Sequence, residues 1–69
     1  YPRGLREDQI HLLSRILAIV GAYEAMTTAH PSRKALPRKK ALEELRRGAG
    51  KQFDPHLVEI FTELLRQDS

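Results

Sequence analysis

The sequence of 69 residues contains no cysteine and no tryptophan, and its only aromatic residues are two tyrosines and two phenylalanines. Without cysteine the chain forms neither a disulfide nor a thiolate metal site, and this composition fits the reducing cytoplasm. The three histidines, His11, His30 and His56, match no zinc-binding spacing. His56 falls in the first turn of a predicted helix and is expected to be exposed, without a metal or catalytic role. The sequence therefore predicts no metal or cofactor bound by this chain alone.

Other patterns that carry chemistry are also absent. The sequence has no glycine-rich phosphate loop, no internal repeat, no low-complexity tract and no coupled Ser, His and Asp arrangement. The first residues, YPRGLRED, are polar, and no isolated apolar segment typical of a secretory signal follows a basic start. We therefore predict no catalytic residue in this chain and a cytoplasmic location.

The longest segment that keeps one helical period without a proline is residues 8–28. It predicts a central helix about 30 Å long, along which the other elements pack. Charged and polar residues interrupt it and argue against a membrane span: Asp8, His11, Arg15 and Glu24. Gly21 has two interpretations, because a glycine inside a helix costs about 1 kcal/mol. It either lets a neighbouring helix approach closely or marks the loss of a functional side chain.

Proline and glycine divide the rest of the chain into short elements. The predicted boundaries are a loop at 1–7, a helix at about 8–28, a connection at 29–37, a helix at about 38–47, a turn at 48–53 and a helix at about 54–66. Asp8 is the predicted N-cap of the first helix. Asp54 is the predicted N-cap of the third, with Pro55 at its first position and Phe53 placed to pack onto Val58. We predict a single all-α domain, a three-helix bundle over residues 1–69.

The long helix is apolar around most of its circumference, and only two further helices are available to cover it. A chain of this length buries little more than ~60% of its unfolded surface. An uncovered stripe of Leu and Ile side chains exceeds what soluble monomers usually expose. We therefore predict a homodimer. Its predicted interface consists of Ile10, Leu13, Ile16, Leu17 and Val20.

The net charge of +3 is less informative than its distribution. Five cations fall within eight residues and form a basic patch: Arg33, Lys34, Arg38, Lys39 and Lys40. Three of them lie at the start of a predicted helix, where the helix dipole disfavours positive charge. The patch is either a solvated face or a site that holds an anion. No aromatic residue lies between Ser32 and Gln52, so stacking on single-stranded nucleic acid is not expected.

The order and spacing of several short motifs resemble the C-terminal third of HD-GYP domains over nearly the whole chain. These motifs are YPRGL at 1–5, SRILAIV at 14–20, AMTT at 25–28, PSRKA at 31–35, ALEEL at 41–45 and GKQFDP at 50–55. Domains of this family are bacterial, all-helical phosphodiesterases that open cyclic di-GMP at a di- or tri-nuclear iron or manganese centre. The resemblance implies a part of this larger helical fold, with cyclic di-GMP as a ligand.

The resemblance also assigns positions in the metal centre. Tyr1 and Pro2 correspond to the last two letters of the motif that names the family. The histidine-rich ligand set and the helices that would cover the long helix would then lie upstream, so those helices or a second copy are the expected protein partners. Gly21 occupies the position of an aspartate ligand, and glycine has no donor atom. Glu24 lies one turn further, ~4.5 Å along the axis, and is not expected to restore ligation.

The resemblance implies phosphate contacts for His30 and Arg33. Arg33 keeps the planar fork that suits a phosphate, whereas His30 replaces an arginine and would bind weakly and in a pH-dependent way. Ala29 and Ser32 also depart from the family pattern. This combination indicates a degenerate HD-GYP protein with a binding or regulatory role in cyclic di-GMP signalling. The alternatives are an active phosphodiesterase with an altered metal centre, and a basic helical module for nucleic acid or acidic protein.

Overall fold

The structure is a computed structural model that describes residues 4–67. Three α-helices follow one another along the chain: α1 (Glu7–Thr27), α2 (Arg38–Arg47) and α3 (Pro55–Gln67). Within residues 4–67 the β-type pairing is limited to two isolated bridges, His30 with Arg33 and Ala49 with Phe53. The predicted all-α class with three helices is therefore confirmed.

An arginine occupies the N-cap of α1, so the prediction of Asp8 as the cap is wrong. Arg6 has an extended backbone, with φ −84° and ψ 165°. Its backbone N–H donates to Gln9 Oε1 at 2.8 Å, so Gln9 is the residue whose side chain reaches back to the N-cap, as in a capping box. Asp8 lies inside the first turn, where its Oδ1 accepts from Arg6 Nε at 3.2 Å. Its negative charge is favourable at that end of the helix dipole.

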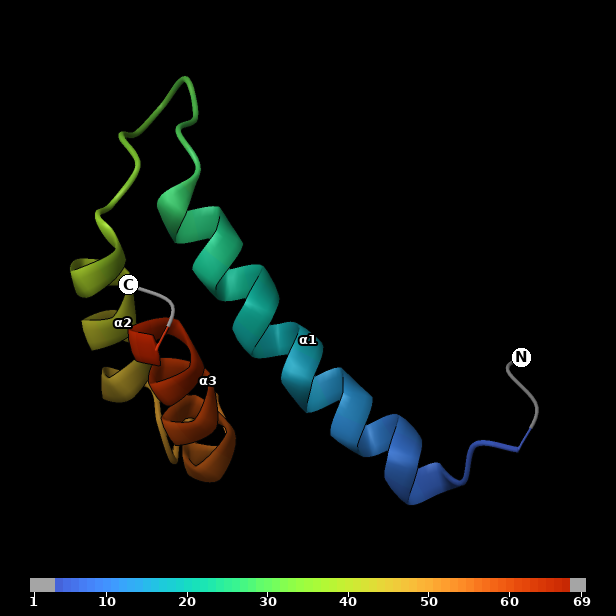
Figure 1. Cartoon of the computed structure of the whole chain (residues 1–69). Coiled ribbons are helices and arrows are strands. Elements are labelled where there is room, and N and C mark those ends of the chain that lie inside the picture. Colours follow the sequence, from blue (N-terminus) through green and yellow to red (C-terminus); the bar gives the residue numbers. More distant parts are fainter. Residues whose placement is uncertain (1–3, 68–69) are drawn as a thin grey trace.

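The three helices meet at the C-terminal half of α1 (Figure 1). Ile19, Leu45 and Val58 form the buried centre, and none is more than 2% exposed. Tyr23 and Phe61 pack edge to face beside it, with ring centroids 5.2 Å apart. The half-buried residues around this centre include Ala22, Met26, Leu42, Ala49, Phe53 and Leu57. The core is small, and it joins one half of α1 to the α2–α3 pair.

Gly48 ends α2 and begins the tight turn that leads to α3. Its carbonyl oxygen accepts the N–H groups of Lys51, Gln52 and Phe53 at 3.0, 3.1 and 3.1 Å. A Cβ atom on Gly48 would lie 2.8 Å from a ring carbon of Phe53, so a side chain there would displace the ring. Gly50 has φ +82°, a conformation that glycine adopts without steric cost. The two glycines therefore place the Phe53 ring against the core.

The N-terminal half of α1 extends beyond the other two helices (Figure 1), and Ile19 is the one fully buried residue of α1. The prediction that the other elements pack along the whole helix is therefore wrong for this half. The reason is length, because α1 is about 31 Å long whereas α2 and α3 are about 15 and 20 Å. The large apolar side chains left exposed here are Ile10, Leu12, Leu13, Ile16 and Leu17.

By length and composition alone, α1 is apolar enough to cross a membrane. This is weak support for a membrane helix, because the core helix of a soluble protein has the same length and composition. Arg15 and Glu24 both lie within α1, and burying either charge in a bilayer is costly. The absence of a membrane partner stays a prediction.

Candidate functional site

Three positions singled out by the motif resemblance line one shallow cavity of about 330 Å³: Gly21, Glu24 and His30. Gly21 and Glu24 lie three residues apart on α1, which places them on the same helix face. His30 comes from the loop that follows α1, and all three residues are exposed. Ala25 and Thr28 complete the lining. The cavity therefore contains one carboxylate and one imidazole beside a position without a side chain.

Gly21 faces open space. Outside its own turn of helix, no described atom lies within 4 Å of a Cβ built on Gly21. The interpretation that this glycine allows a neighbouring helix to approach is therefore wrong for the part of the chain that the structure describes. A side chain at this position would reach the cavity shared with Glu24 and His30. The assignment of Gly21 to the family's ligand position stays a prediction.

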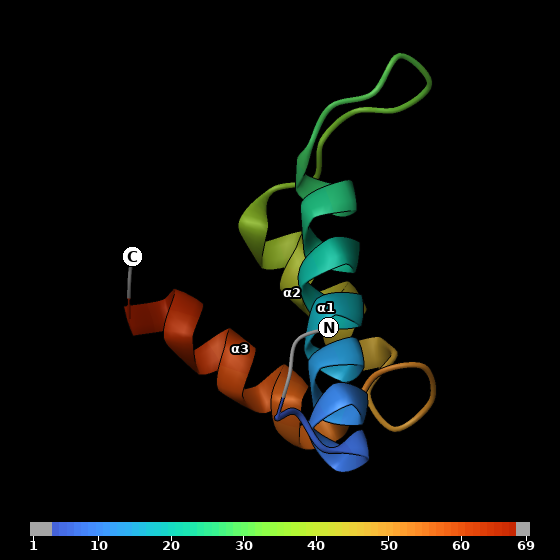
Figure 2. The ribbon, with the colours of Figure 1, turned by 90° about the vertical axis from the view of Figure 1, so that its right-hand side faces the viewer.

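The loop after α1 projects from the helices as a narrow hairpin (Figure 2). At its tip His30 N–H donates to the Arg33 carbonyl at 3.0 Å, and Arg33 N–H donates to the His30 carbonyl at 3.1 Å. Further along, Leu36 N–H donates to the Met26 carbonyl at 2.7 Å. These backbone hydrogen bonds hold His30 and Arg33 opposite each other and connect the second half of the loop to the end of α1.

The Arg33 side chain reaches toward the C-terminal end of α1. Its Nη2 donates to the Ala25 carbonyl at 3.4 Å, a position where a cation also complements the helix dipole. His30 lines the Gly21 cavity, whereas Arg33 is not among its lining residues. The structure thus brings one of the two predicted phosphate-binding residues into the cavity. A guanidinium has five N–H donors, so the contact with Ala25 leaves others for a ligand.

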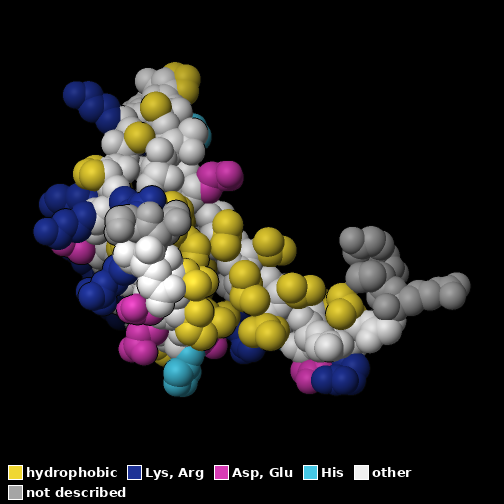
Figure 3. Space-filling view, viewed as in Figure 1, with side chains coloured by type: hydrophobic (Ala, Val, Ile, Leu, Met, Phe, Trp, Pro, Cys, Tyr) yellow, Lys and Arg dark blue, Asp and Glu magenta, His cyan; other side chains and the backbone are white. Residues whose placement is uncertain are grey.

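The residues of the basic patch are all exposed, and basic side chains gather on the α2 side of the molecule (Figure 3). Arg38 Nη1 donates to the Leu65 carbonyl at 3.2 Å, in the last turn of α3. The cation at the start of α2 therefore lies beside the negative end of a neighbouring helix dipole. Arg38 therefore has one partner in the protein's own backbone, and its other N–H donors remain exposed. Whether the basic patch is a solvated face or holds an anion stays a prediction.

The predicted oligomer interface is uncovered within residues 4–67, where the exposure of its residues ranges from 37% for Ile16 to 66% for Leu17. Yellow apolar side chains follow α1 along the visible face in Figure 3. Ile16 and Val20 also line an apolar groove of about 190 Å³ with Leu57, Ile60, Phe61 and Leu64 of α3 and with Ile19. The apolar surface therefore continues from α1 onto one side of α3. Its partner stays a prediction.

The described residues do not form a metal centre. Within residues 4–67, no three His, Asp or Glu side chains come together in a way that would hold an ion. The Gly21 cavity offers two donor side chains, Glu24 and His30, whereas catalytic zinc sites use three protein ligands. His56 is 93% exposed, with Nδ1 4.0 Å from Asp54 Oδ1, and it is not part of that cavity. A di- or tri-nuclear centre does not fit these residues without ligands from elsewhere.

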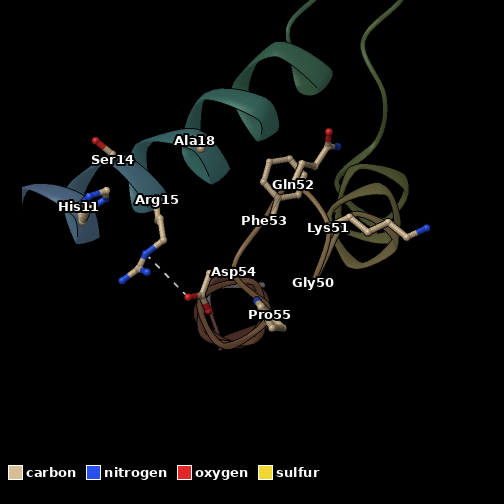
Figure 4. A pocket seen from close by; sticks show the side chains of 10 residues that line it. All are labelled: His11, Ser14, Arg15, Ala18, Gly50, Lys51, Gln52, Phe53, Asp54 and Pro55. Atoms are coloured by element: carbon tan, nitrogen blue, oxygen red, sulfur yellow. Dashed lines mark ion pairs between the residues drawn. The ribbon is translucent and has the colours of Figure 1, made fainter. Parts of the chain in front are cut away.

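A larger cavity, of about 390 Å³, lies between α1 and the turn before α3 (Figure 4). It is lined by His11, Ser14, Arg15 and Ala18 from α1 and by residues 50–55. Across it, Arg15 Nε lies 3.9 Å from Asp54 Oδ2. Asp54 Oδ1 accepts the N–H groups of His56 and Leu57 at 2.9 and 3.2 Å, which confirms the predicted N-cap.

Arg15 was not predicted to be a contact residue of this cavity. Arg15 stands out as a cation within an otherwise apolar helical segment, and arginines in such places usually have a partner. Its partner, however, lies on another helix, and no local pattern points to it. Because the carboxylate of Asp54 already balances Arg15, we assign this cavity a structural role in joining α1 to α3.

Comparison with known proteins extends the motif resemblance. The family model described as HD domain matches residues 1–57 of the chain. This match includes Tyr1 and Pro2, the predicted remnant of the naming motif, which lie outside the described residues. No solved structure matches the chain significantly.

Several curated bacterial proteins are similar to most of this chain. A cyclic di-GMP phosphodiesterase of Thermotoga maritima is 33% identical over 67 residues, which are 97% of this chain and 18% of that protein. The cyclic di-GMP phosphodiesterase response regulator RpfG of Xanthomonas campestris is 36% identical over 59 residues, 86% of this chain and 16% of the regulator. A 3'3'-cGAMP-specific phosphodiesterase of Vibrio cholerae is 34% identical over 55 residues, 80% of this chain and 12% of that enzyme.

The chain spans less than a fifth of the length of these relatives. The matching region includes α1, the loop that follows it, α2 and the turn into α3, which are the elements that build both cavities. The family model covers most of the chain, and the names of the relatives agree with the family that the motifs resemble. The chain therefore belongs to the HD domain family and is related to its HD-GYP members.

Proposed function

We propose that this chain acts as the C-terminal subdomain of a degenerate HD-GYP protein, with a binding or regulatory role in cyclic di-GMP signalling and without catalysis of its own. The observation that supports this proposal most is the Gly21 cavity. At the position where the resemblance implies an aspartate ligand, the cavity has no side chain, and Glu24 and His30 are the donors that remain. The names of the relatives support a cyclic dinucleotide as the ligand, since those proteins are phosphodiesterases of cyclic di-GMP or 3'3'-cGAMP.

In this role the loop after α1 provides the phosphate contacts. His30 and Arg33 face each other across the closed tip, so their side chains start from adjacent backbone positions. Arg33 approaches the same end of α1 through the Ala25 carbonyl, and His30 lines the cavity directly. A dinucleotide phosphate placed between the two would receive a planar fork from Arg33 and one imidazole donor from His30. This is a weaker anion site than a pair of arginines.

A second candidate function is an active phosphodiesterase with an altered metal centre. The observation that favours it is the shared cavity of Gly21 and Glu24, because a carboxylate one turn away opens onto the same space. In that case Glu24, together with ligands from outside this chain, would hold the metal. The third candidate, a basic module for nucleic acid or acidic protein, has less support because no aromatic residue between Ser32 and Gln52 accompanies the basic patch.

Calorimetric titration with cyclic di-GMP, followed by chromatography of the nucleotide, tests the proposal. We expect weak binding of cyclic di-GMP, and Arg33→Ala should reduce its affinity. Lys40→Ala is the matched cation control and should leave the affinity nearly unchanged. The nucleotide should remain intact in the presence of Mn²⁺ or Fe²⁺. Hydrolysis that depends on metal and is abolished by Glu24→Gln would favour the active enzyme instead. Equal losses of affinity in the Arg33 and Lys40 variants would indicate general attraction by the basic patch and contradict the assigned phosphate site.

The same proposal includes a protein partner and a cellular location. We expect a protein partner to cover the exposed apolar stripe on α1, either helices of the larger HD-GYP fold or a second copy of this chain. The lack of cysteine supports a cytoplasmic location.

A further inference from the structure

A shallow groove of about 210 Å³ lies between α2 and α3. The two helices run antiparallel, because a short turn joins them and Arg38 at the start of α2 contacts the Leu65 carbonyl near the end of α3. Most of the side chains that line the groove are charged: Lys39, Leu42, Glu43, Arg46, Thr62 and Arg66. Lys39 and Arg66 therefore lie at the same end of the groove.

Thr62 lines this groove, and its hydroxyl has no hydrogen-bond partner. The residue is 4% exposed, and its Oγ1 is buried without a partner among the described residues. A threonine inside a helix can donate to the carbonyl four residues earlier, as Thr27 Oγ1 does to the Tyr23 carbonyl at 2.9 Å. A buried hydroxyl without a partner destabilises the fold. A ligand that offers this hydroxyl an acceptor would recover that loss.

The charges that line the groove favour an anion as the ligand. Three cations and one carboxylate line it, so positive charge is in excess, and basic side chains gather on this side of the molecule (Figure 3). Arg66 Nη1 lies 3.5 Å from Glu63 Oε1, and both side chains are more than half exposed. Within residues 4–67, Lys39 and Arg46 form no ion pair. Glu43 is the one lining group that would repel an anion.

We propose that the groove between α2 and α3 binds a phosphate group. The Thr62 hydroxyl would donate to one phosphate oxygen. Threonine has two common side-chain rotamers in a helix, so a rotation about its Cα–Cβ bond turns the hydroxyl toward the groove. Lys39 and Arg66 would hold the phosphate from one end of the groove through charge-assisted hydrogen bonds, and Arg46 would hold it from further along α2.

The residue types of the groove favour a site that stays open to solvent. Covering Lys39 and Arg46 with another helix would take two cations out of water, which is costly. The volume of about 210 Å³ corresponds to roughly seven molecules of liquid water, which is room for one phosphate group rather than a whole cyclic dinucleotide. His30 and Arg33 do not line this groove. The inference therefore does not depend on the proposed nucleotide role.

A ¹H–¹⁵N NMR titration with inorganic phosphate, at constant ionic strength, tests the site. We expect saturable shifts of the backbone amides of Lys39, Thr62 and Arg66. Lys39→Ala should weaken binding roughly ten-fold, because it removes a charged donor. Lys40→Ala is the matched control: it removes the same charge from the same turn but does not line the groove, so the affinity should stay nearly unchanged. Glu43→Gln should tighten binding about two- to five-fold.

The same titration with adenosine monophosphate distinguishes two sources of the phosphate group. Tighter binding of the nucleotide than of inorganic phosphate would assign the groove to a phosphate monoester, and the reverse would assign it to the free ion. Shifts that do not saturate with either ligand would overturn the proposal. Equal losses of affinity in Lys39→Ala and Lys40→Ala would also overturn it, because they indicate general attraction to a basic surface.

Thr62→Val tests the hydroxyl separately, because valine has nearly the same shape. In phosphate-free buffer this variant should unfold at a higher urea concentration than the wild type, since it removes a buried hydroxyl without a partner. It should also bind phosphate about two- to ten-fold more weakly, so that phosphate raises its urea midpoint less than that of the wild type. If Thr62→Val destabilises the phosphate-free protein, the hydroxyl has a partner within the chain and the proposal is wrong.

Discussion

Arg15 on α1 and Asp54 at the start of α3 form an ion pair, with Arg15 Nε 3.9 Å from Asp54 Oδ2. The other oxygen of the same carboxylate accepts the N–H groups of His56 and Leu57. One aspartate therefore caps α3 and connects it to the half of α1 that projects beyond the core. Arg15 is 53% exposed and Asp54 is 24% exposed, so water screens the pair only in part.

Asp54→Ala should lower the free energy of unfolding by about 1–2 kcal/mol, with about 1 kcal/mol from the cap and less than about 1 kcal/mol from the ion pair. Urea unfolding followed by far-UV circular dichroism measures this. Asp54→Ser keeps a capping oxygen and removes the charge, so its loss should be smaller. The coupling energy between Arg15→Ala and Asp54→Ala, from a double-mutant cycle, measures the ion pair separately. If Asp54→Ala and Asp54→Ser lower the free energy of unfolding equally, the capping role is contradicted.

Gly48→Ala should destabilise the fold, because its Cβ would lie 2.8 Å from the Phe53 ring that packs on the core. The expected loss is about 1–3 kcal/mol, as for other overpacked sites. Gly21→Ala is the matched control: its Cβ meets open space, and alanine is favoured in a helix by about 1 kcal/mol, so it should stabilise. Both are measured by urea unfolding at low protein concentration. If both substitutions stabilise the protein, the Phe53 ring is not packed closely against Gly48.

Arg38→Ala should lower the free energy of unfolding by about 0.5–1.5 kcal/mol, because the Leu65 carbonyl loses its side-chain donor and the end of α3 loses a nearby cation. Lys40→Ala removes a cation from the same turn of α2 and should have a smaller effect. Thermal unfolding of the two variants at low and high salt compares them. If both lose the same stability and salt removes both effects, general electrostatics rather than the Leu65 contact accounts for the result.

Protein purified without chelator should contain less than one iron, manganese or zinc per chain by elemental analysis. The reason is that the Gly21 cavity offers two donor side chains, Glu24 and His30, in the described part of the chain. In a longer protein that contains this chain and preserves the upstream ligands, Gly21→Asp should raise the metal content and Gly21→Asn should raise it less. One or more tightly bound metals per isolated chain would contradict this expectation.

Local signals were sufficient for the helices themselves. Pro37 before α2, Gly48 after it and the Asp54–Pro55 pair before α3 act on the backbone within a few residues, so their effects are visible in the sequence. The same holds for the family relationship, because the motifs are short and contiguous. The N-cap of α1 was missed because Arg6 is not a usual capping residue and the accepting side chain belongs to Gln9.

The tertiary structure alone decided which surfaces are covered and where the cations point. Ile19 and Leu17 are both apolar residues of α1, yet Ile19 is 2% exposed and Leu17 is 66% exposed, because α2 and α3 cover only the side and the length of α1 that they reach. Arg33 and Arg38 contact carbonyls 8 and 27 residues away in sequence. Every residue carries a backbone carbonyl, so the residue types do not reveal such partners, and only the packing of helix ends determines them.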